Sequence, residues 1–211
     1  LHLCEDEEIF FEKRKKCVNE ELHKQRLDEN KILYGIERVP NIAVIGSGGG
    51  MRAVVGMCGA MVALKDLGIL DAAMYTAGVS GSSYLSTLYA NKHEINPTSV
   101  KNSIQERLQS APETFIRLLM SSLEVFISHI FDGDISLTDI YGDKVGAILL
   151  GKDHIPKWSD LRETLQHAEL PLPLLAAVHV RDKWIECSPY EVFMPKYGTS
   201  IDMKHFGSEF D

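Results

Sequence analysis

Apolar positions near the middle of the chain follow first the pattern of a strand, then that of a helix, then that of a strand again. The run Asn41-Ile42-Ala43-Val44-Ile45 is short, carries β-branched residues and is typical of a buried parallel strand. From Met51 to Leu67 apolar residues lie on most faces of a helix, and Gly68 follows where a helix commonly ends. Residues 71–78 predict a second short strand, with a helix after it at residues 82–91. This order predicts a βαβ unit and an α/β fold, with a parallel or mixed sheet flanked by helices.

The beginning of the chain predicts an amphipathic helix over residues 5–30, because charges of both signs alternate with apolar residues at helical spacing. Its apolar residues are Ile9, Phe10, Cys17, Val18, Leu22 and Leu27. We favour a helix that packs one stripe on the rest of the protein over a helix that binds a partner or a membrane. Pro40 separates it from the first strand, so we expect an N-terminal helical segment at residues 1–39 and a second domain at residues 40–211.

Beyond Pro97 the pattern is helical again, with a polar helix expected at residues 100–109 and a strongly apolar stretch at residues 115–131. That stretch has the character of a lid that touches lipid, but a core helix is the simpler interpretation. Asp132-Gly133-Asp134 predicts a turn. The residues that follow this turn lack the further ligands and the terminal glutamate of a calcium loop.

The last part of the chain predicts one helix and two paired strands. The helix is expected at residues 158–167, and a buried strand is expected at residues 174–180. Residues 184–187 are expected to pair with that strand across a turn at residues 181–183. Residues 188–211 mix proline, glycine and aromatic residues and predict irregular structure.

Composition places the chain among globular proteins, with 45% hydrophobic residues. A net charge of −8 argues against a nucleic-acid-binding surface, which is usually basic. No run of about 18 apolar residues predicts a membrane-spanning helix, and the acidic start is unlike a secretory signal. The cysteines lack the spacing of a disulfide framework or a zinc site, so a reducing compartment is expected. They are Cys4, Cys17, Cys58 and Cys187.

Candidate chemistry is concentrated in two glycine-rich segments. The first, Gly46-Ser47-Gly48-Gly49-Gly50 (the glycine loop), follows the first strand and opens a helix, where backbone N–H groups and the helix dipole favour an anion. The second, Gly78-Val79-Ser80-Gly81-Ser82 (the elbow), resembles the G-x-S-x-G turn that exposes the nucleophile of a serine hydrolase, with Ser82 in place of the last glycine. A serine hydroxyl needs exposure, a base and oxyanion donors to react. Ser80 is therefore the candidate nucleophile.

A dinucleotide site is the main alternative for the glycine loop, since the loop lies between a strand and a helix. However, G-x-G-x-x-G counted from Gly46 places Met51 at the last position, and Asp66 and Asp71 precede the second strand instead of ending it. A P-loop would need a terminal G-K-S/T, which is absent here. Taken by itself, the glycine loop is also compatible with a purely structural turn. The pair of segments favours an oxyanion or phosphate site.

Together the two segments resemble the cytosolic, group IV phospholipase A2 family, relatives of the patatin-like lipases. The resemblance rests on the elbow and on the glycine loop with Met51, Arg52 and Ala53, where Ser82 and Ala53 stand in place of glycines found in patatins. It continues at Leu67-Gly68-Ile69-Leu70-Asp71, Ser188-Pro189-Tyr190-Glu191, Lys196-Tyr197-Gly198-Thr199 and Phe206-Gly207-Ser208. It runs over most of the chain from about Pro40 and implies the fold of a phospholipase catalytic domain, here truncated.

The resemblance implies phospholipase A2-type hydrolysis of glycerophospholipid esters through an acyl-enzyme on Ser80. It implies that Gly49 and Gly50 donate backbone N–H groups to the oxyanion and that Arg52 holds the substrate phosphate. For Arg52, an ordinary surface arginine on the first helical turn is the alternative. The family uses a Ser–Asp dyad without a catalytic histidine, so the resemblance implies no cofactor and no metal for catalysis.

The dyad aspartate of that family belongs to a D-S-G or D-G-G type motif, which does not occur in these 211 residues. We therefore expect this chain to hold the nucleophile half of the site and to be a poor enzyme by itself. A catalytically silent lipid-binding or regulatory fragment of the same fold is the alternative. The resemblance further implies a cytosolic protein that associates peripherally with a phospholipid membrane surface, and no obligate protein partner is expected.

Overall fold

The structure, a computed structural model, describes residues 3–28, 39–83, 96–109, 149, 157–179 and 183–207. The chain forms two compact units. The first consists of Leu1–Thr98 and Lys157–Asp211, and the second of Ser99–Pro156. The strands that the structure describes and the two glycine-rich segments belong to the first unit.

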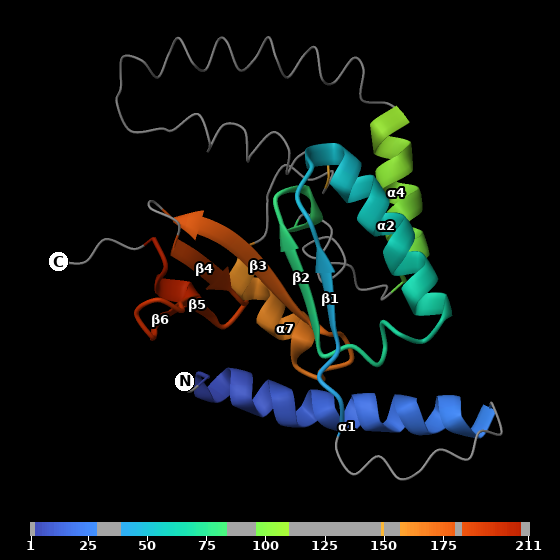
Figure 1. The fold of residues 1–211 in the computed structure, drawn as a ribbon, viewed down its shortest axis with the longest axis horizontal. Helices are drawn as coiled ribbons and strands as arrows, with labels where there is room; N and C mark the ends of the chain where they lie inside the picture. The colour runs from blue at the N-terminus through green and yellow to red at the C-terminus, as the bar shows by residue number, and fades with distance from the viewer. Residues whose placement is uncertain are drawn as a thin grey trace. The chain divides into compact units, whose positions relative to one another are not determined.

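The first unit is built on a mixed six-stranded sheet whose strands lie in the order of the sequence (Figure 1). Strands β1 (Ala43–Gly46), β2 (Tyr75–Val79) and β3 (Leu172–His179) are parallel. Strands β4 (Lys183–Cys187), β5 (Glu191–Met194) and β6 (Thr199–Asp202) continue the sheet in antiparallel pairs. The expected α/β fold with a parallel or mixed sheet is thereby confirmed, as is the pairing of β4 with β3.

The βαβ unit predicted from the apolar pattern is present, but the expected burial of its first strand and of the strand at residues 174–180 was wrong. Strand β1 lies at the edge of the sheet, where Ile45 is 75% exposed, and Val178 is 57% exposed. Helix α2 (Gly50–Asp66) connects β1 to β2 and buries one face, made of Val54, Met57, Cys58 and Met61. It ends as expected, since Gly68 has a φ of 71° and its N–H donates to the Lys65 carbonyl. Of the helix expected at residues 82–91, residues 81–83 are helical and residues 84–91 lie outside the described residues.

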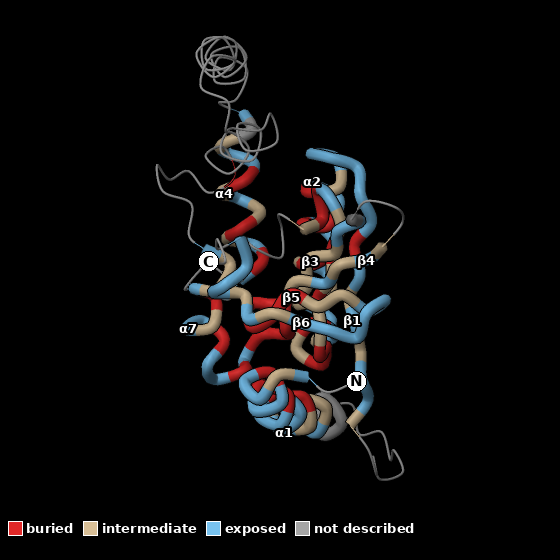
Figure 2. Tube along the Cα trace, turned by 90° about the vertical axis from the view of Figure 1, so that its left-hand side faces the viewer, coloured by how far each residue is buried: buried red, intermediate tan, exposed pale blue. Residues whose placement is uncertain are grey.

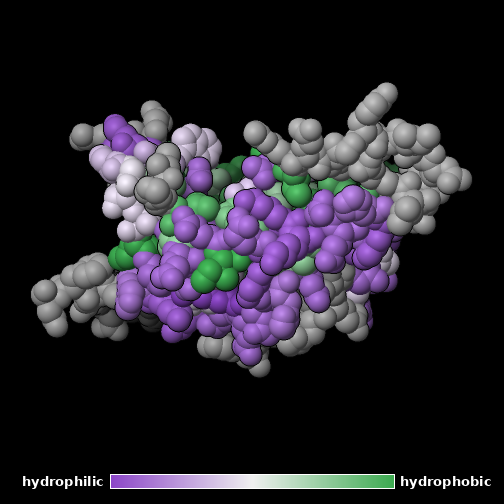
Figure 3. Space-filling model, turned by 90° about the horizontal axis from the view of Figure 1, so that it is seen from below, coloured by the Kyte–Doolittle hydropathy of each residue, from purple (hydrophilic) through white to green (hydrophobic). Residues whose placement is uncertain are grey.

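Helix α1 (Glu5–Asp28) confirms the N-terminal helix, but its buried face is not the apolar stripe that the sequence predicts. The buried residues are Glu7, Phe10, Phe11, Arg14 and Val18, while Ile9 is 49% exposed. They follow helical spacing, and two of them are charged. In Figure 2 the buried residues of α1 face the sheet. Figure 3 views the molecule from the side on which α1 lies, and the surface on this side is largely hydrophilic.

A buried arginine attaches α1 to the loops that precede two of the parallel strands. Arg14 is 1% exposed. It donates hydrogen bonds to the carbonyls of Leu70, Asp71, Ala73, Ala168 and Glu169. The bond from its Nη2 to the Ala73 oxygen measures 2.6 Å, close to the start of β2. Helix α1 therefore lies at the amino ends of the parallel strands (Figure 1).

The end of the chain is more regular than the sequence predicts. The expectation of irregular structure at residues 188–211 was wrong, because β5 and β6 form a hairpin followed by the short 3₁₀ helix Met203–His205. A proline and a glycine of this segment lie in the turn between β5 and β6. Gly198 has a φ of 61°, and its N–H donates to the Met194 carbonyl. The predicted helix at residues 158–167 appears as a 3₁₀ turn, Trp158–Asp160, and α7 (Leu161–Leu165).

The described part of the second unit is helical. Helix α4 (Pro97–Gln109) confirms the helix expected at residues 100–109, and it buries Val100 and Ile104. The apolar stretch at residues 115–131 and the turn expected at residues 132–134 lie outside the described residues. None of the helices in the described part of the chain is both long and apolar enough to cross a lipid bilayer.

Candidate active site

Ser80 occupies a sharp turn directly after β2. It is exposed, and its φ of 55° lies in the left-handed region that non-glycine residues rarely adopt. The Ser83 N–H donates to the Ser80 carbonyl at 3.0 Å, which closes the turn into the helical residues that follow. Such strained residues often occur at functional sites, because the surrounding structure must hold them in place. The geometry is that of a nucleophile elbow.

The glycine loop uses two unusual backbone conformations to begin α2. Gly49, the N-cap residue, has a φ of 144°, and Gly50 has a φ of 59°, so a side chain at either position would be strained. Both residues are exposed. The first N–H groups of a helix lack partners within the helix, and no acidic residue lies in the first turn of α2. The helix start is therefore open to an anion.

The loop and the elbow meet where the parallel strands β1 and β2 end, with Gly46 paired to Gly78. A Cβ added to Gly81 would lie 1.9 Å from the Gly50 carbonyl oxygen, so the two backbones touch. A Cβ added to Gly48 would lie 3.3 Å from the Cβ of Ser80. The structure therefore brings Ser80 against the glycine loop, as a nucleophile beside an oxyanion site would require.

Ser82 holds the two segments together by a contact that the sequence did not predict. Its hydroxyl donates to the Ser47 carbonyl at 2.5 Å, and the residue is 2% exposed. A Cβ added to Gly46 would lie 2.5 Å from the Cβ of Ser82, so Gly46 leaves the space that this serine fills. In the sequence Ser82 was visible only as a departure from G-x-S-x-G. The signal that could have identified its role is the small residue at position 46, opposite it.

Arg52 lies in the first turn of α2, two residues after Gly50, and is exposed. This location leaves its guanidinium accessible to solvent beside the start of the helix. The role of Arg52 in phosphate binding stays a prediction, as do the oxyanion roles of Gly49 and Gly50. What the structure provides is an accessible serine, a glycine loop against it and an arginine on the helix that the loop begins.

Comparison with known proteins places this arrangement in a family. Residues 42–211 match the family model described as lysophospholipase catalytic domain. Cytosolic phospholipase A2 zeta of Mus musculus is 33% identical over 230 residues, an alignment that covers 99% of this chain and 26% of the mouse protein.

Solved structures agree with the sequence match. Human GIVD cytosolic phospholipase A2 in complex with methyl gamma-linolenyl fluorophosphonate aligns with a TM-score of 0.81 and 32% identity, covering 99% of this chain and 31% of the human chain. The same human protein in another structure aligns with a TM-score of 0.76 and 28% identity, covering 95% and 28%. The chain thus spans less than a third of the relatives' length. It belongs to the lysophospholipase catalytic domain family, as its resemblance to the cytosolic, group IV phospholipases predicted.

Proposed function

We propose that Ser80 is the nucleophile of a phospholipase A2-type hydrolase that acts on glycerophospholipid acyl esters. The observation that carries the proposal is the exposed Ser80, with a φ of 55°, held against the glycine loop. Family membership supports it, because the relatives matched are phospholipases by name. A solved relative in complex with a fluorophosphonate also supports it, since such compounds react with activated serines.

In the proposed reaction the Ser80 Oγ bonds to the ester carbonyl carbon while a base takes its proton. The negative charge that develops on the carbonyl oxygen is stabilised by the N–H groups of Gly49 and Gly50. The C–O bond to the glycerol then breaks, and the lysophospholipid leaves with the proton. Water hydrolyses the acyl-serine and releases the fatty acid. No cofactor or metal takes part in these steps.

Substrate binding follows from the same end of the sheet. The exposed guanidinium of Arg52 suits a phosphate, with which it can form paired charge-assisted hydrogen bonds. Phospholipids are presented by membranes, so we propose a cytosolic protein that acts at a membrane surface. The mouse relative carries the word cytosolic in its name, in keeping with this proposal.

The base of the dyad is an aspartate that we place outside these 211 residues, because they contain no D-S-G or D-G-G motif. In this proposal the chain by itself holds Ser80 in position without activating it. The alternative function is a catalytically silent lipid-binding or regulatory module of the same fold.

The test is labelling with a fluorophosphonate probe, with intact mass as the readout. We expect slow, incomplete labelling of the 211-residue chain and fast labelling of a longer chain that includes an aspartate motif. Ser80→Ala should abolish labelling in both, whereas Ser200→Ala, on exposed β6, should leave it unchanged. Labelling that survives Ser80→Ala would overturn the assignment of the nucleophile. A longer chain that binds phospholipid vesicles but never labels would favour the silent module.

A further inference from the structure

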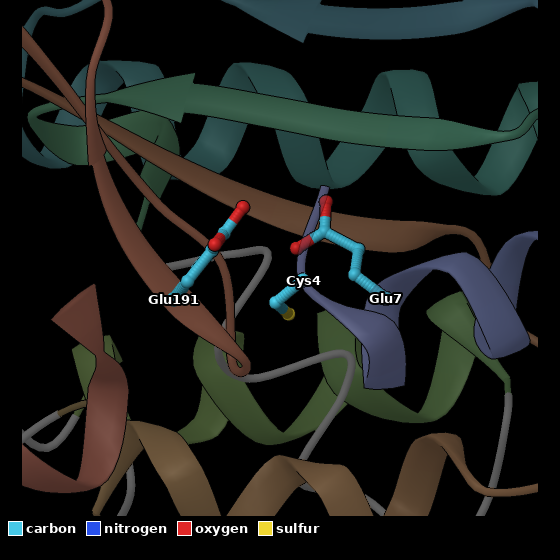
Figure 4. A group of neighbouring side chains, drawn as sticks. All are labelled: Cys4, Glu7 and Glu191. Carbon is cyan, nitrogen blue, oxygen red and sulfur yellow. The ribbon is translucent and has the colours of Figure 1, made fainter. Parts of the chain in front are cut away.

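A second group of reactive side chains lies at the other end of the first unit, where α1 meets the sheet. Cys4, Glu7 and Glu191 each direct one thiol or carboxylate atom into a common space, and these atoms lie within 4.8 Å of one another. Glu7 projects from α1 and Glu191 from β5, and their carboxylates point toward each other with Cys4 beside them (Figure 4). Nothing in the proposed hydrolysis uses this cluster.

The two carboxylates are buried together without a balancing cation. Glu7 is 4% exposed and Glu191 is 6% exposed. In the part of the chain that the structure describes, no ion pair reaches either of them. Buried carboxylates are costly unless they are paired, protonated or bound to a cation.

Glu191 points into the cluster without a protein partner. Its side chain makes no hydrogen bond and no ion pair among the described residues. The residue is 6% exposed, and its carboxylate oxygens keep contact with solvent. A cavity of about 50 Å³ lies beside it. Its lining is half polar, from Glu7, Glu186 and Ser188, and half apolar, from Leu3, Leu174 and Phe193, and Cys4 lies next to it without lining it. That is enough space for a metal ion or a water molecule. An unpartnered carboxylate beside a small cavity that other carboxylates also line is a candidate ligand for a cation.

Glu7 is already oriented toward the cavity. The Ser188 hydroxyl donates to its Oε2 at 2.8 Å, and the same hydroxyl accepts the N–H groups of Tyr190 and Glu191. A hydrogen bond of this kind fixes the direction of a ligating carboxylate and strengthens metal binding. The turn that leads into β5 therefore sets the position of both glutamates.

We propose that Cys4, Glu7 and Glu191 bind a zinc ion, which joins the beginning of α1 to β5. Ligand atoms on one tetrahedral zinc lie roughly 3.5 Å apart, given bonds of about 2.0–2.3 Å, so small side-chain movements suffice from the present separations. The thiol favours zinc over calcium or magnesium, which take oxygen ligands. The fourth position is open to water or to Glu186, which lines the same cavity.

A proton shared between the two glutamates is the competing explanation for their proximity. A shared proton would leave the melting temperature independent of zinc, whereas a zinc site makes it rise with the zinc concentration. The Cys4 thiol, which a shared proton does not involve, is a ligand only in the zinc site.

The test uses the 211-residue chain after removal of metal with a chelator. Titration with zinc, followed by calorimetry and thermal unfolding, should give one site and a melting temperature that rises with zinc concentration. Cobalt should give a near-ultraviolet band from a thiolate-to-metal transition. Cys4→Ser should remove that band, and Glu191→Gln and Glu7→Gln should each weaken zinc binding by at least about tenfold.

Matched controls lie on the same helix. Cys17→Ser removes another half-buried thiol, and Glu5→Gln removes an exposed carboxylate two residues before Glu7. Both should bind zinc like the parent chain. Circular dichroism of every variant establishes that α1 is still folded. A cobalt band that survives Cys4→Ser, a band lost in Cys17→Ser, or the absence of any zinc-dependent heat would overturn the proposal. Ser80→Ala should bind zinc normally, so the result is independent of the proposed hydrolysis.

Discussion

The elbow and the junction of α1 with the sheet lie at opposite ends of β2, and they are built by different means. At the elbow, backbones approach closely because glycines leave room, and Ser80 is held exposed by the turn. At the junction, charged side chains are buried and must find polar partners, as Arg14 does among backbone carbonyls. Local backbone conformation therefore makes the site accessible, while long-range polar contacts fix the end of the sheet that supports it.

The largest effect should come from breaking the junction. Arg14→Met keeps an apolar side chain but leaves several buried carbonyls without a donor, so we expect a loss of at least about 3 kcal/mol in the free energy of unfolding. The adjacent Lys13→Met is the control, because Lys13 makes one exposed hydrogen bond to the Gln166 carbonyl and should cost less than about 1 kcal/mol. Urea unfolding measures both. Equal losses in the two variants would show that the buried hydrogen bonds of Arg14 contribute no more to stability than the exposed hydrogen bond of Lys13.

The second largest loss of stability should come from a side chain added where the backbones of the elbow and the glycine loop touch. In Gly81→Ala the new Cβ would meet the Gly50 carbonyl oxygen at 1.9 Å, so the loop must move, at a cost of about 2–3 kcal/mol. Gly59→Ala on α2 is the matched control: its Cβ meets nothing within 4 Å, and alanine should stabilise the helix by about 0.5–1 kcal/mol. Thermal unfolding of the two variants should shift in opposite directions. A Gly81→Ala protein as stable as the parent would refute the close approach.

The smallest effect should come from removing the side-chain hydrogen bond between the elbow and the glycine loop. Ser82→Ala removes the donor to the Ser47 carbonyl, and we expect a loss of about 1–2 kcal/mol because this acceptor is left unpaired. Ser200→Ala on exposed β6 should stay within about 0.5 kcal/mol of the parent. Chemical unfolding of both chains checks the difference. If Ser82→Ala cost as much as Arg14→Met, the elbow would depend on polar side chains as much as the junction does.

The central βαβ unit could be predicted from the sequence because its signals are local. A short β-branched run, a helix with apolar residues on most faces and glycines at both turns each act within a few residues. The same locality made Ser80 recognisable, since its exposure depends on the turn that its own neighbours form. Strands β5 and β6 were missed because the proline and glycine of the turn between them predicted a loop.

The βαβ order, the turn at Ser80 and the family of the chain follow from local sequence patterns. The burial of Arg14 and Glu7 on α1, the link that Ser82 makes between the two glycine segments, and the meeting of Cys4 and Glu7 with Glu191 become visible in the folded chain alone. Periodicity reports which face of an element is apolar, and nothing about partners far away in the chain. A charged residue is buried only where groups far away in the chain provide its hydrogen bonds or its counter-charge.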